Sequence, residues 1–512
     1  MTMGHAHHCR KTALSGGIRI TAHGVAVWAA AVLLSAPLLA GNASEPQAPG
    51  NFGTPPLHWR VDADDLDGAR RLLKSGADAN ALTERGVSPL SLAVANGNAA
   101  MVQLLIRSGA KANQSGPAGE TLLMQAAQVG ETAVVKLLLD HGAEVNARDP
   151  HFGQTALMFA ARAGHAPIAS LLIARGAELD AVTKAGAPPA WVRPNSQAGY
   201  GFGIGIIRGG TPADRGRRDA ATGGMTAIHF AARQGFADVV DLLIKAGAKV
   251  NPREANDITP LLMAISNNNV AAAKTLLAQG GEVNAQDWYG RSPLWEAVNV
   301  RNLYVHNATF RNGIDRPPVL ELIKALLAAG ANVNARTKET PPFRNHLLEI
   351  TGSLEWVDFT GQTPFLTAAL AGDVTVMKLL LAHGADPMIG TFQGTSALMA
   401  AAGVNWVMAQ TWTEGPAPLL EAVKLCHELG MDVNQANSMG VTALHGAANR
   451  GSDDIIRFLV DRGADLTAQD NERRTALDWA KGVFLATHPA EPKPSSIALI
   501  TSLLKAQGRE VR

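Results

Sequence analysis

A unit of about 33 residues recurs along this chain of 512 residues. Its most regular mark is a glycine before a polar turn, and successive marked glycines are 33, 33, 34, 71, 33, 50, 54, 46 and 33 residues apart. A fixed period of about 20–50 residues indicates stacked supersecondary units. We therefore predict ten copies of one unit, interrupted four times, and a partial last unit from Arg474 toward Gly508. The marked glycines are Gly76, Gly109, Gly142, Gly176, Gly247, Gly280, Gly330, Gly384, Gly430 and Gly463.

The stretch GMTAIHFAARQGFADVVDLLIKAGAKVN, at 224–251, shows what one unit encodes. Thr226 is placed to cap a helix whose apolar residues recur at helical spacing, and Gly235 ends that helix. A second helix with a strongly apolar face stops at Gly247, where a residue without a Cβ atom can adopt the left-handed conformation. Neither helix can bury its apolar face alone, so neighbouring units are expected to share one continuous core.

The period, the segments TALH at 442–445 and TAIH at 226–229, and the recurrent ending LL-x-x-GA-x-VN resemble ankyrin repeats. The resemblance covers nearly all of the chain from Thr54 to about Gly508. It implies an all-α solenoid of stacked helix pairs, with hairpin loops projecting from one edge and a concave face that mostly binds other proteins. It says almost nothing about chemistry.

The chain is expected to divide into three blocks of repeats, at 54–181, 223–337 and 360–508, after a linker at 44–53. Insertions at 182–222 and 338–359 lie between the end of one repeat and the Thr of the next, so they extend the hairpin edge. Two other interruptions, at 302–318 and after Gly403, lie between the two helices of their own repeats and should protrude from the opposite edge.

Residues 1–43 have the order of an export signal. Arg10, Lys11 and Arg19 precede an uncharged apolar run at 24–40, and Gly41 and Ala43 supply small residues for cleavage. The alternative is an uncleaved membrane anchor, although Pro37 breaks the run. We expect export, to the periplasm or beyond, and no membrane contact by the mature chain.

Composition narrows the function classes. A formal net charge of +1 gives no indication of nucleic-acid binding. Of the two cysteines, Cys9 lies within the predicted signal, so an exported chain keeps only Cys426 and cannot form an internal disulfide.

The insertion at 182–222 alternates glycines with apolar side chains but has neither the G-x-G-x-x-G nor the G-x-x-x-x-G-K spacing of nucleotide-binding loops. It is either a mobile glycine-rich loop or an aromatic finger that grips a partner, because it carries residue types that interfaces favour. Those residues are Trp191, Arg193, Tyr200, Phe202 and Arg208.

The insertion at 338–359 either packs a short helix around 346–350 back onto the array or presents Phe343, Arg344 and Trp356 beside the first insertion. The hairpin turn between the two insertions holds Trp288, Tyr289 and Arg291, together with Asp287, and we expect these side chains to be exposed. These three places form the predicted protein-binding surface.

No convergent catalytic constellation is found in the sequence. His58, His229 and His445 occupy the Thr-x-x-His slot, in which ankyrin repeats use imidazole for hydrogen bonds between turns. Cys426 and His427 are adjacent on a predicted helix, so their side chains point about 100° apart, and Cys426 aligns with the apolar Leu138. We predict no catalytic residue, no cofactor and no metal site.

The sequence therefore predicts an exported, periplasmic scaffold that binds another protein through its concave face and its hairpin-edge insertions. One alternative is a small-ligand receptor or enzyme built from the insertions. Another is a secreted effector that binds a host protein.

Overall fold

The computed structural model describes residues 54–116, 118–186, 223–302, 316–338, 360–405, 413–483 and 491–509. The chain divides into two compact units, Met1–Asn51 and Phe52–Arg512, and every described helix belongs to the second. The described residues contain no strand, and isolated β-bridges join Ser115 to Thr121 and Ala436 to Thr442. The predicted all-α class is confirmed.

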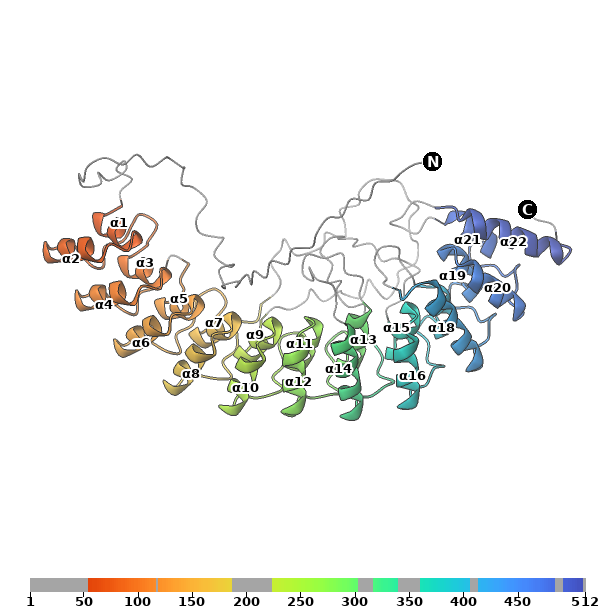
Figure 1. Cartoon of the computed structure of the whole chain (residues 1–512), viewed down its shortest axis with the longest axis horizontal. Coiled ribbons are helices and arrows are strands. Elements are labelled where there is room, and N and C mark those ends of the chain that lie inside the picture. Colours follow the sequence, from red (N-terminus) through yellow and green to blue (C-terminus); the bar gives the residue numbers. More distant parts are fainter. Residues whose placement is uncertain are drawn as a thin grey trace, which may run out of the picture. The chain divides into compact units, whose positions relative to one another are not determined.

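The helices form pairs that stand side by side in chain order (Figure 1). The first helices of the pairs are α1 (Pro56–Asp62), α3 (Pro89–Ala95), α5 (Leu122–Val129), α7 (Ala156–Ala163), α9 (Ala227–Gln234), α11 (Pro260–Ser266), α13 (Pro293–Arg301), α15 (Pro364–Ala371), α17 (Ala397–Ala402), α19 (Ala443–Arg450) and α21 (Ala476–Gly482). The second helices are α2 (Leu66–Lys74), α4 (Ala99–Arg107), α6 (Thr132–Asp140), α8 (Ala166–Ala174), α10 (Ala237–Lys245), α12 (Val270–Ala278), α14 (Arg316–Ala328), α16 (Val374–Ala382), α18 (Pro416–Glu428), α20 (Asp453–Asp461) and α22 (Pro494–Ala506).

The ends of these helices follow the sequence signals. Thr226 caps α9 and forms a reciprocal capping box with His229. The ten marked glycines all have φ between +84° and +101°, a region in which a Cβ atom is strained. The glycine that ends each second helix is therefore required by backbone geometry, and it could be recognised from the sequence alone.

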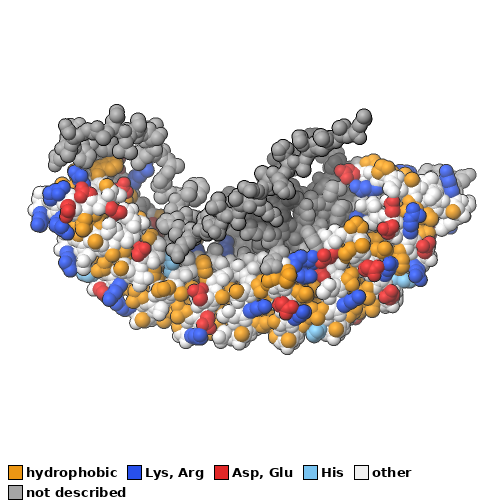
Figure 2. Space-filling model, in the orientation of Figure 1, with side chains coloured by type: hydrophobic (Ala, Val, Ile, Leu, Met, Phe, Trp, Pro, Cys, Tyr) orange, Lys and Arg blue, Asp and Glu red, His pale blue; other side chains and the backbone are white. Residues whose placement is uncertain are grey.

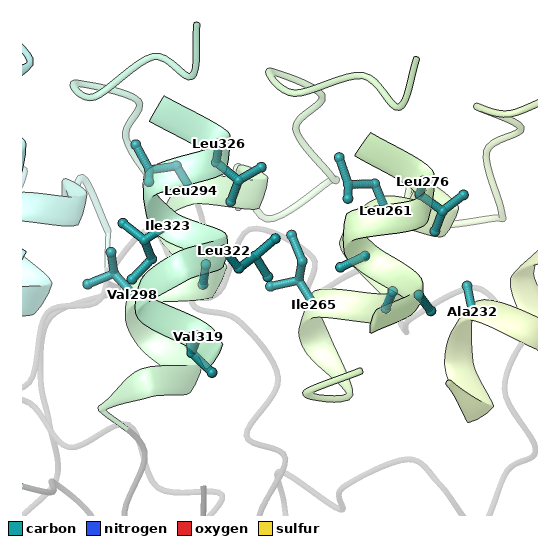
Figure 3. Packing of buried hydrophobic residues seen from close by; sticks show 14 of the residues in the cluster. Ala232, Leu261, Ile265, Leu276, Leu294, Val298, Val319, Leu322, Ile323 and Leu326 are labelled. Carbon is teal, nitrogen blue, oxygen red and sulfur yellow. The ribbon is translucent and has the colours of Figure 1, made fainter. Parts of the chain in front are cut away.

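The core is continuous from one pair to the next. Figure 3 shows Leu261 and Ile265 of α11 beside α12, and Leu294 and Val298 of α13 packed against Ile323 of α14. These residues belong to one buried cluster that begins at Leu57 and ends at Leu504. Each pair thus covers the apolar face of its neighbour, as expected for a solenoid.

A ladder of asparagines joins the turns that follow the second helices. The side chain of Asn113 donates to the carbonyl of Gly142 at 2.8 Å and accepts from the backbone N–H of Glu144 at 2.9 Å. The same two bonds recur at Asn80, Asn146, Asn251, Asn284, Asn334 and Asn434. At the three other corresponding positions the sequence has Asp180, Met388 and Thr467. Asp180 keeps only the accepting bond, from the N–H of Lys249 at 3.0 Å.

Both hairpin-edge insertions leave the array through the same backbone motif. Thr183 accepts the backbone N–H of Met225 on its hydroxyl at 3.0 Å, and Thr337 accepts that of Gln362 at 2.9 Å. The backbone N–H of Thr183 also donates to Met225, and that of Thr337 to Gln362. The hairpin is therefore closed below each insertion, and the repeat is intact on both sides of it.

The second helices after the other two interruptions are longer than their counterparts. Helices α14 and α18 each have 13 residues, whereas α12 and α16 have nine, so they begin within the sequence segments assigned to the interruptions. A buried ion network holds the start of α14, because Asp373 accepts from Arg301 at 2.8 Å and from Arg316 at 3.2 Å. Arg316 also pairs with Glu414, which precedes α18.

Candidate functional site: the hairpin edge

The histidines of the Thr-x-x-His slots are structural, as predicted. In His229, Nδ1 accepts the backbone N–H of Thr226 at 3.2 Å and Nε2 donates to the carbonyl of Ile258 at 3.1 Å. His445 makes the equivalent bonds with Thr442 and Arg474, and His58 reaches the carbonyl of Val87. Burial lowers the pKa of His229 to about 4 and also lowers that of His445. His229 and His445 are therefore neutral at pH 7, and all three imidazoles link consecutive turns by hydrogen bonds.

Cys426 is a buried structural thiol, as predicted. Its side chain is fully buried in α18, and this burial raises the pKa of the thiol to about 12. The neighbouring His427 stacks edge-on against Phe458, with ring centroids 5.8 Å apart. A thiol of this kind is not a nucleophile at neutral pH. No group of three or more potential metal ligands occurs among the residues that the structure describes.

The expected exposure of the turn between the insertions is wrong for most of its side chains. Asp287, Tyr289 and Arg291 are only 2%, 8% and 5% exposed, and Trp288 alone is half-buried. The reason is an internal ion cluster: Arg291 Nε lies 2.7 Å from Asp287 Oδ2, and Arg291 Nη1 lies 3.7 Å from Glu296 Oε1. The guanidinium folds back along its own turn instead of pointing to solvent.

The electrostatics of this cluster are those of a buried pair. Burial raises the pKa of Asp287, and Arg291 opposes that rise. Burial also disfavours the charged guanidinium, but Glu296 and Asp287 outweigh this effect and the pKa of Arg291 is raised. An acid with an arginine four residues later recurs at Asp470 and Arg474, whose Nε and Oδ2 atoms lie 2.7 Å apart. This spacing is the sequence signal that could have predicted the ion pair, but not the burial of the arginine, since the Arg474 side chain is 31% exposed.

Eight members of the predicted surface lie outside the described residues. They are Trp191, Arg193, Tyr200, Phe202, Arg208, Phe343, Arg344 and Trp356.

The hairpin edge contains a cavity of about 550 Å³ that sequence reasoning missed. It lies between the turns that follow Gly280, Gly330 and Gly384, and its lining includes Asn284, Gln286, Asn334, Arg336, Lys338 and Phe392. We call it the hairpin pocket. The backbone N–H of Lys338 donates to the carbonyl of Tyr289 at 2.8 Å, so the pocket adjoins the turn that carries Trp288. Of the predicted surface, the structure thus brings this turn and the base of the second insertion together.

Arg336 is held rigidly at the pocket. Its Nε donates to the carbonyl of Gly361 at 3.1 Å and its Nη2 to that of Gly390 at 2.7 Å. Its guanidinium carbon lies 4.3 Å from the centre of the Phe392 ring, and that ring is 59% exposed. In the face drawn in Figure 2, basic and acidic side chains are interspersed along the array.

Comparison with known proteins agrees with this architecture. Family models described as ankyrin repeats match residues 31–116, 57–149, 90–183, 209–287 and 228–337, together with 360–389 and 425–480. The first of these matches begins inside the apolar run at 24–40.

Curated relatives resemble parts of the chain. Ankyrin repeat and SOCS box protein 6 from Homo sapiens is 32% identical over 165 residues, which are 32% of this chain and 35% of that protein. Ankyrin repeat protein nuc-2 from Neurospora crassa is 31% identical over 192 residues, 37% of this chain and 17% of that protein. The chain thus spans about a third or less of the length of these relatives.

Among solved structures, the human ASB11 ankyrin repeat domain is 22% identical and has a TM-score of 0.38, covering 57% of this chain and 100% of that one. No helix among the described residues is long and apolar enough to cross a membrane. A single type of ankyrin-repeat model matches more than half of the 512 residues. The chain therefore belongs to the ankyrin-repeat family.

Proposed function

We propose that this chain is a scaffold that binds another protein through its hairpin edge and the face formed by its first helices. The observation that carries the proposal is the hairpin pocket, in which a fixed arginine and an exposed aromatic ring lie at the base of an insertion. Arginine is one of the residue types that dominate binding energy in protein interfaces, and phenylalanine is enriched there.

Exposed aromatic residues accompany both hairpin-edge insertions. Phe152 is 65% exposed, and its carbonyl accepts the backbone N–H of Lys184, three residues before the undescribed segment 187–222. The backbone N–H of Phe392 donates to Thr360, the first described residue after the second such segment. A partner bound by either insertion would therefore meet an apolar anchor on the rigid array beside it.

We also propose that the protein is exported to the periplasm, with secretion as the alternative destination. The support is the order of basic residues, apolar run and small residues in 1–43. Cell fractionation and N-terminal sequencing test this proposal: a mature chain that starts at Ser44 in the periplasmic fraction is expected. A cytosolic chain with an intact N-terminus would refute export.

We propose further that the protein is not an enzyme, since the buried Cys426 thiol is not poised as a nucleophile. A small-ligand receptor is the second candidate, because about 550 Å³ lies within the usual range of about 300–1,000 Å³ for small-molecule sites. Thermal unfolding with a metabolite panel separates the two, because a ligand of the native state must raise the midpoint of unfolding.

Affinity capture with designed deletions tests the scaffold function. The structure fixes their limits: residues 187–222 and 339–359 can be replaced by short Gly-Ser linkers, because Thr183 and Thr337 close the hairpins outside those segments. We expect the exported chain to retain one protein from an envelope extract and the doubly trimmed, folded chain to retain less of it. Equal retention by both chains would place the binding surface away from the insertions.

A further inference from the structure

We propose that the hairpin pocket binds an extended acidic segment of the partner protein, with a carboxylate on Arg336 and Lys338 and an apolar side chain on Phe392. This inference rests on the proposed scaffold function and names the chemistry of the partner. Its basis is a charge imbalance that appears when equivalent positions of different repeats are compared.

The arginine at this position of the repeat is neutralised elsewhere but not in the hairpin pocket. Six residues after the helix-ending glycine, Arg148 pairs with Glu178 at 3.4 Å and Arg253 pairs with Glu282 at 2.8 Å. In each case the acid belongs to the next repeat. Arg336 occupies the same position after Gly330, yet among the described residues no carboxylate lies within ion-pair distance of it.

The acids around the pocket are engaged elsewhere. Asp386, which corresponds to Glu178 and Glu282, accepts the backbone N–H of Met388 at 2.9 Å. Glu282 is held by Arg253, and Asp287 is buried against Arg291. Lys338 is exposed, and it forms no ion pair with any residue of the described ranges. Among the residues that the structure describes, the pocket therefore presents two cations that pair with no acid.

The neutral donors of the pocket are largely occupied, which favours an anionic ligand. The side-chain amide of Asn284 donates to Gly330 and that of Asn334 to Gly384. The amide of Gln286 donates to the carbonyls of both Gly290 and Arg336. The donors left for a ligand include the ammonium of Lys338, the Nη1 edge of Arg336 and the side-chain amide of Asn332. Of these, the two cations can form charge-assisted bonds to a carboxylate, which are about twice as strong as neutral ones.

The remaining surface suits a peptide chain. The Arg336 guanidinium cannot swing away, since two carbonyls and the Phe392 ring hold it, so little side-chain entropy is lost on binding. Phe392 adds an exposed apolar surface directly beside the charge. An extended segment that alternates acidic and apolar residues can use both features at once.

Two labelled peptides test the proposal by fluorescence polarisation with the full chain. One alternates Glu with Leu, and the other alternates Gln with Leu. We expect the Glu peptide to bind about tenfold more tightly, with an affinity that falls as salt is added. We expect the difference between the peptides to vanish in the double variant Arg336→Gln, Lys338→Gln, and Phe392→Ala to weaken both peptides alike.

The matched control is the double variant Lys249→Gln, Arg253→Gln, which removes two cations from the same edge, one of them already paired. We expect it to keep the preference for the Glu peptide, with a thermal unfolding midpoint like that of the pocket variant. Equal affinities for the two peptides, no binding of either, or the same loss in both double variants would refute the proposal.

Two further arms identify other occupants. Competition by free glutarate at concentrations like those of the peptide would show a site for small anions. Binding of the Glu peptide only to a chain that lacks 339–359 would show that this segment of the chain itself fills the pocket. Either result overturns the proposal, and neither bears on whether a partner is captured by the scaffold.

Discussion

The two hairpins that carry insertions are closed by the same hydrogen bonds, but they differ in the residues that precede the insertions. Thr183 and Thr337 close them with equal bonds, and Lys184 and Lys338 follow at matching positions. The first hairpin has Asp180 where the second has Asn334, and Val182 where the second has Arg336.

The charges at the two hairpins differ accordingly. Beside the first hairpin, Arg148 is paired with Glu178, and the Lys184 ammonium donates to the carbonyl of Pro150. The cavity there, of about 450 Å³, is lined by Arg148 together with the two acids Glu178 and Asp180. The second hairpin keeps the asparagine ladder, and its cations Arg336 and Lys338 pair with no carboxylate in the described part of the chain. An insertion alone therefore does not make a charged site, because the residues that flank it determine whether the nearby cations are paired with acids.

The largest expected effect concerns the turns against which these hairpins pack. Asp287→Asn removes one partner of a fully buried ion pair beside the second hairpin and should lower the free energy of unfolding by about 3 kcal/mol. Asp149→Asn, beside the first hairpin, loses only hydrogen bonds to backbone N–H groups and should cost about 1 kcal/mol. Urea unfolding of both variants measures the difference. A larger loss of unfolding free energy for Asp149→Asn than for Asp287→Asn would contradict this prediction.

Low pH should reduce the stability of the repeat that follows the first insertion more than that of the repeat that follows the second. The pKa of His229 falls from 6.5 to about 4 on folding, so the unfolded chain binds more protons between these values. Stability is therefore lost as pH falls from about 6.5 to about 4, by up to about 3 kcal/mol.

The equivalent position after the second insertion is Leu366, which does not titrate. Hydrogen exchange at about pH 7 and pH 4.5 should show faster exchange at low pH in α9, relative to α15, after correction for the intrinsic rates. Equal protection changes in the two helices would contradict this assignment.

Equivalent glycines at the bases of the two hairpins allow a further test of the difference between them. Gly224→Ala and Gly361→Ala both place a Cβ atom on a left-handed residue, at a cost of about 1–2 kcal/mol. At Gly361 the new atom would lie 2.8 Å from Arg336 Nη2, whereas at Gly224 it would lie 3.1 Å from the backbone nitrogen of Ala255. Only Gly361→Ala should reduce binding of the Glu peptide, and a loss in both variants would point to general disorder.

The smallest expected effect is a gain. Asp180→Asn should restore the ladder at this position by donating to the carbonyl of Gly247, as Asn146 donates to Gly176 at 3.0 Å. We expect the free energy of unfolding to rise by about 0.5–1 kcal/mol. Asp180→Ala is the control and should lower it, because the bond from Lys249 is lost. A decrease in both variants would show that the carboxylate has another role.

The fold could be predicted from the sequence because each signal that specifies a helix end lies within one repeat. A Thr or Ser cap, a helix-ending glycine and the interval between them lie within one unit, so ten copies specify the stack. The structural roles of His229 and Cys426 follow from their place in that unit. The export signal and the eight undescribed insertion residues remain predictions.

The hairpin pocket could not be predicted because the residues that form it are far apart in the sequence. Arg336 reaches Gly361 and Gly390 across an insertion, and Phe392 comes from the following repeat. The predicted exposure of the turn at 287–291 is wrong because of a contact that is close in the sequence. The residue types of this turn suit an interface, but the ion pair with Asp287 turns Arg291 inward. Charge pairing between repeats, and not residue type alone, decides which side chains are available.

The most direct test of the central claim is partner capture by two charge-matched variants of the exported chain. We expect the Lys249→Gln, Arg253→Gln variant to retain the same protein as the unmodified chain, and the Arg336→Gln, Lys338→Gln variant to lose it while remaining folded. Undiminished capture by the Arg336→Gln, Lys338→Gln chain would contradict the claim that the hairpin pocket is the binding site.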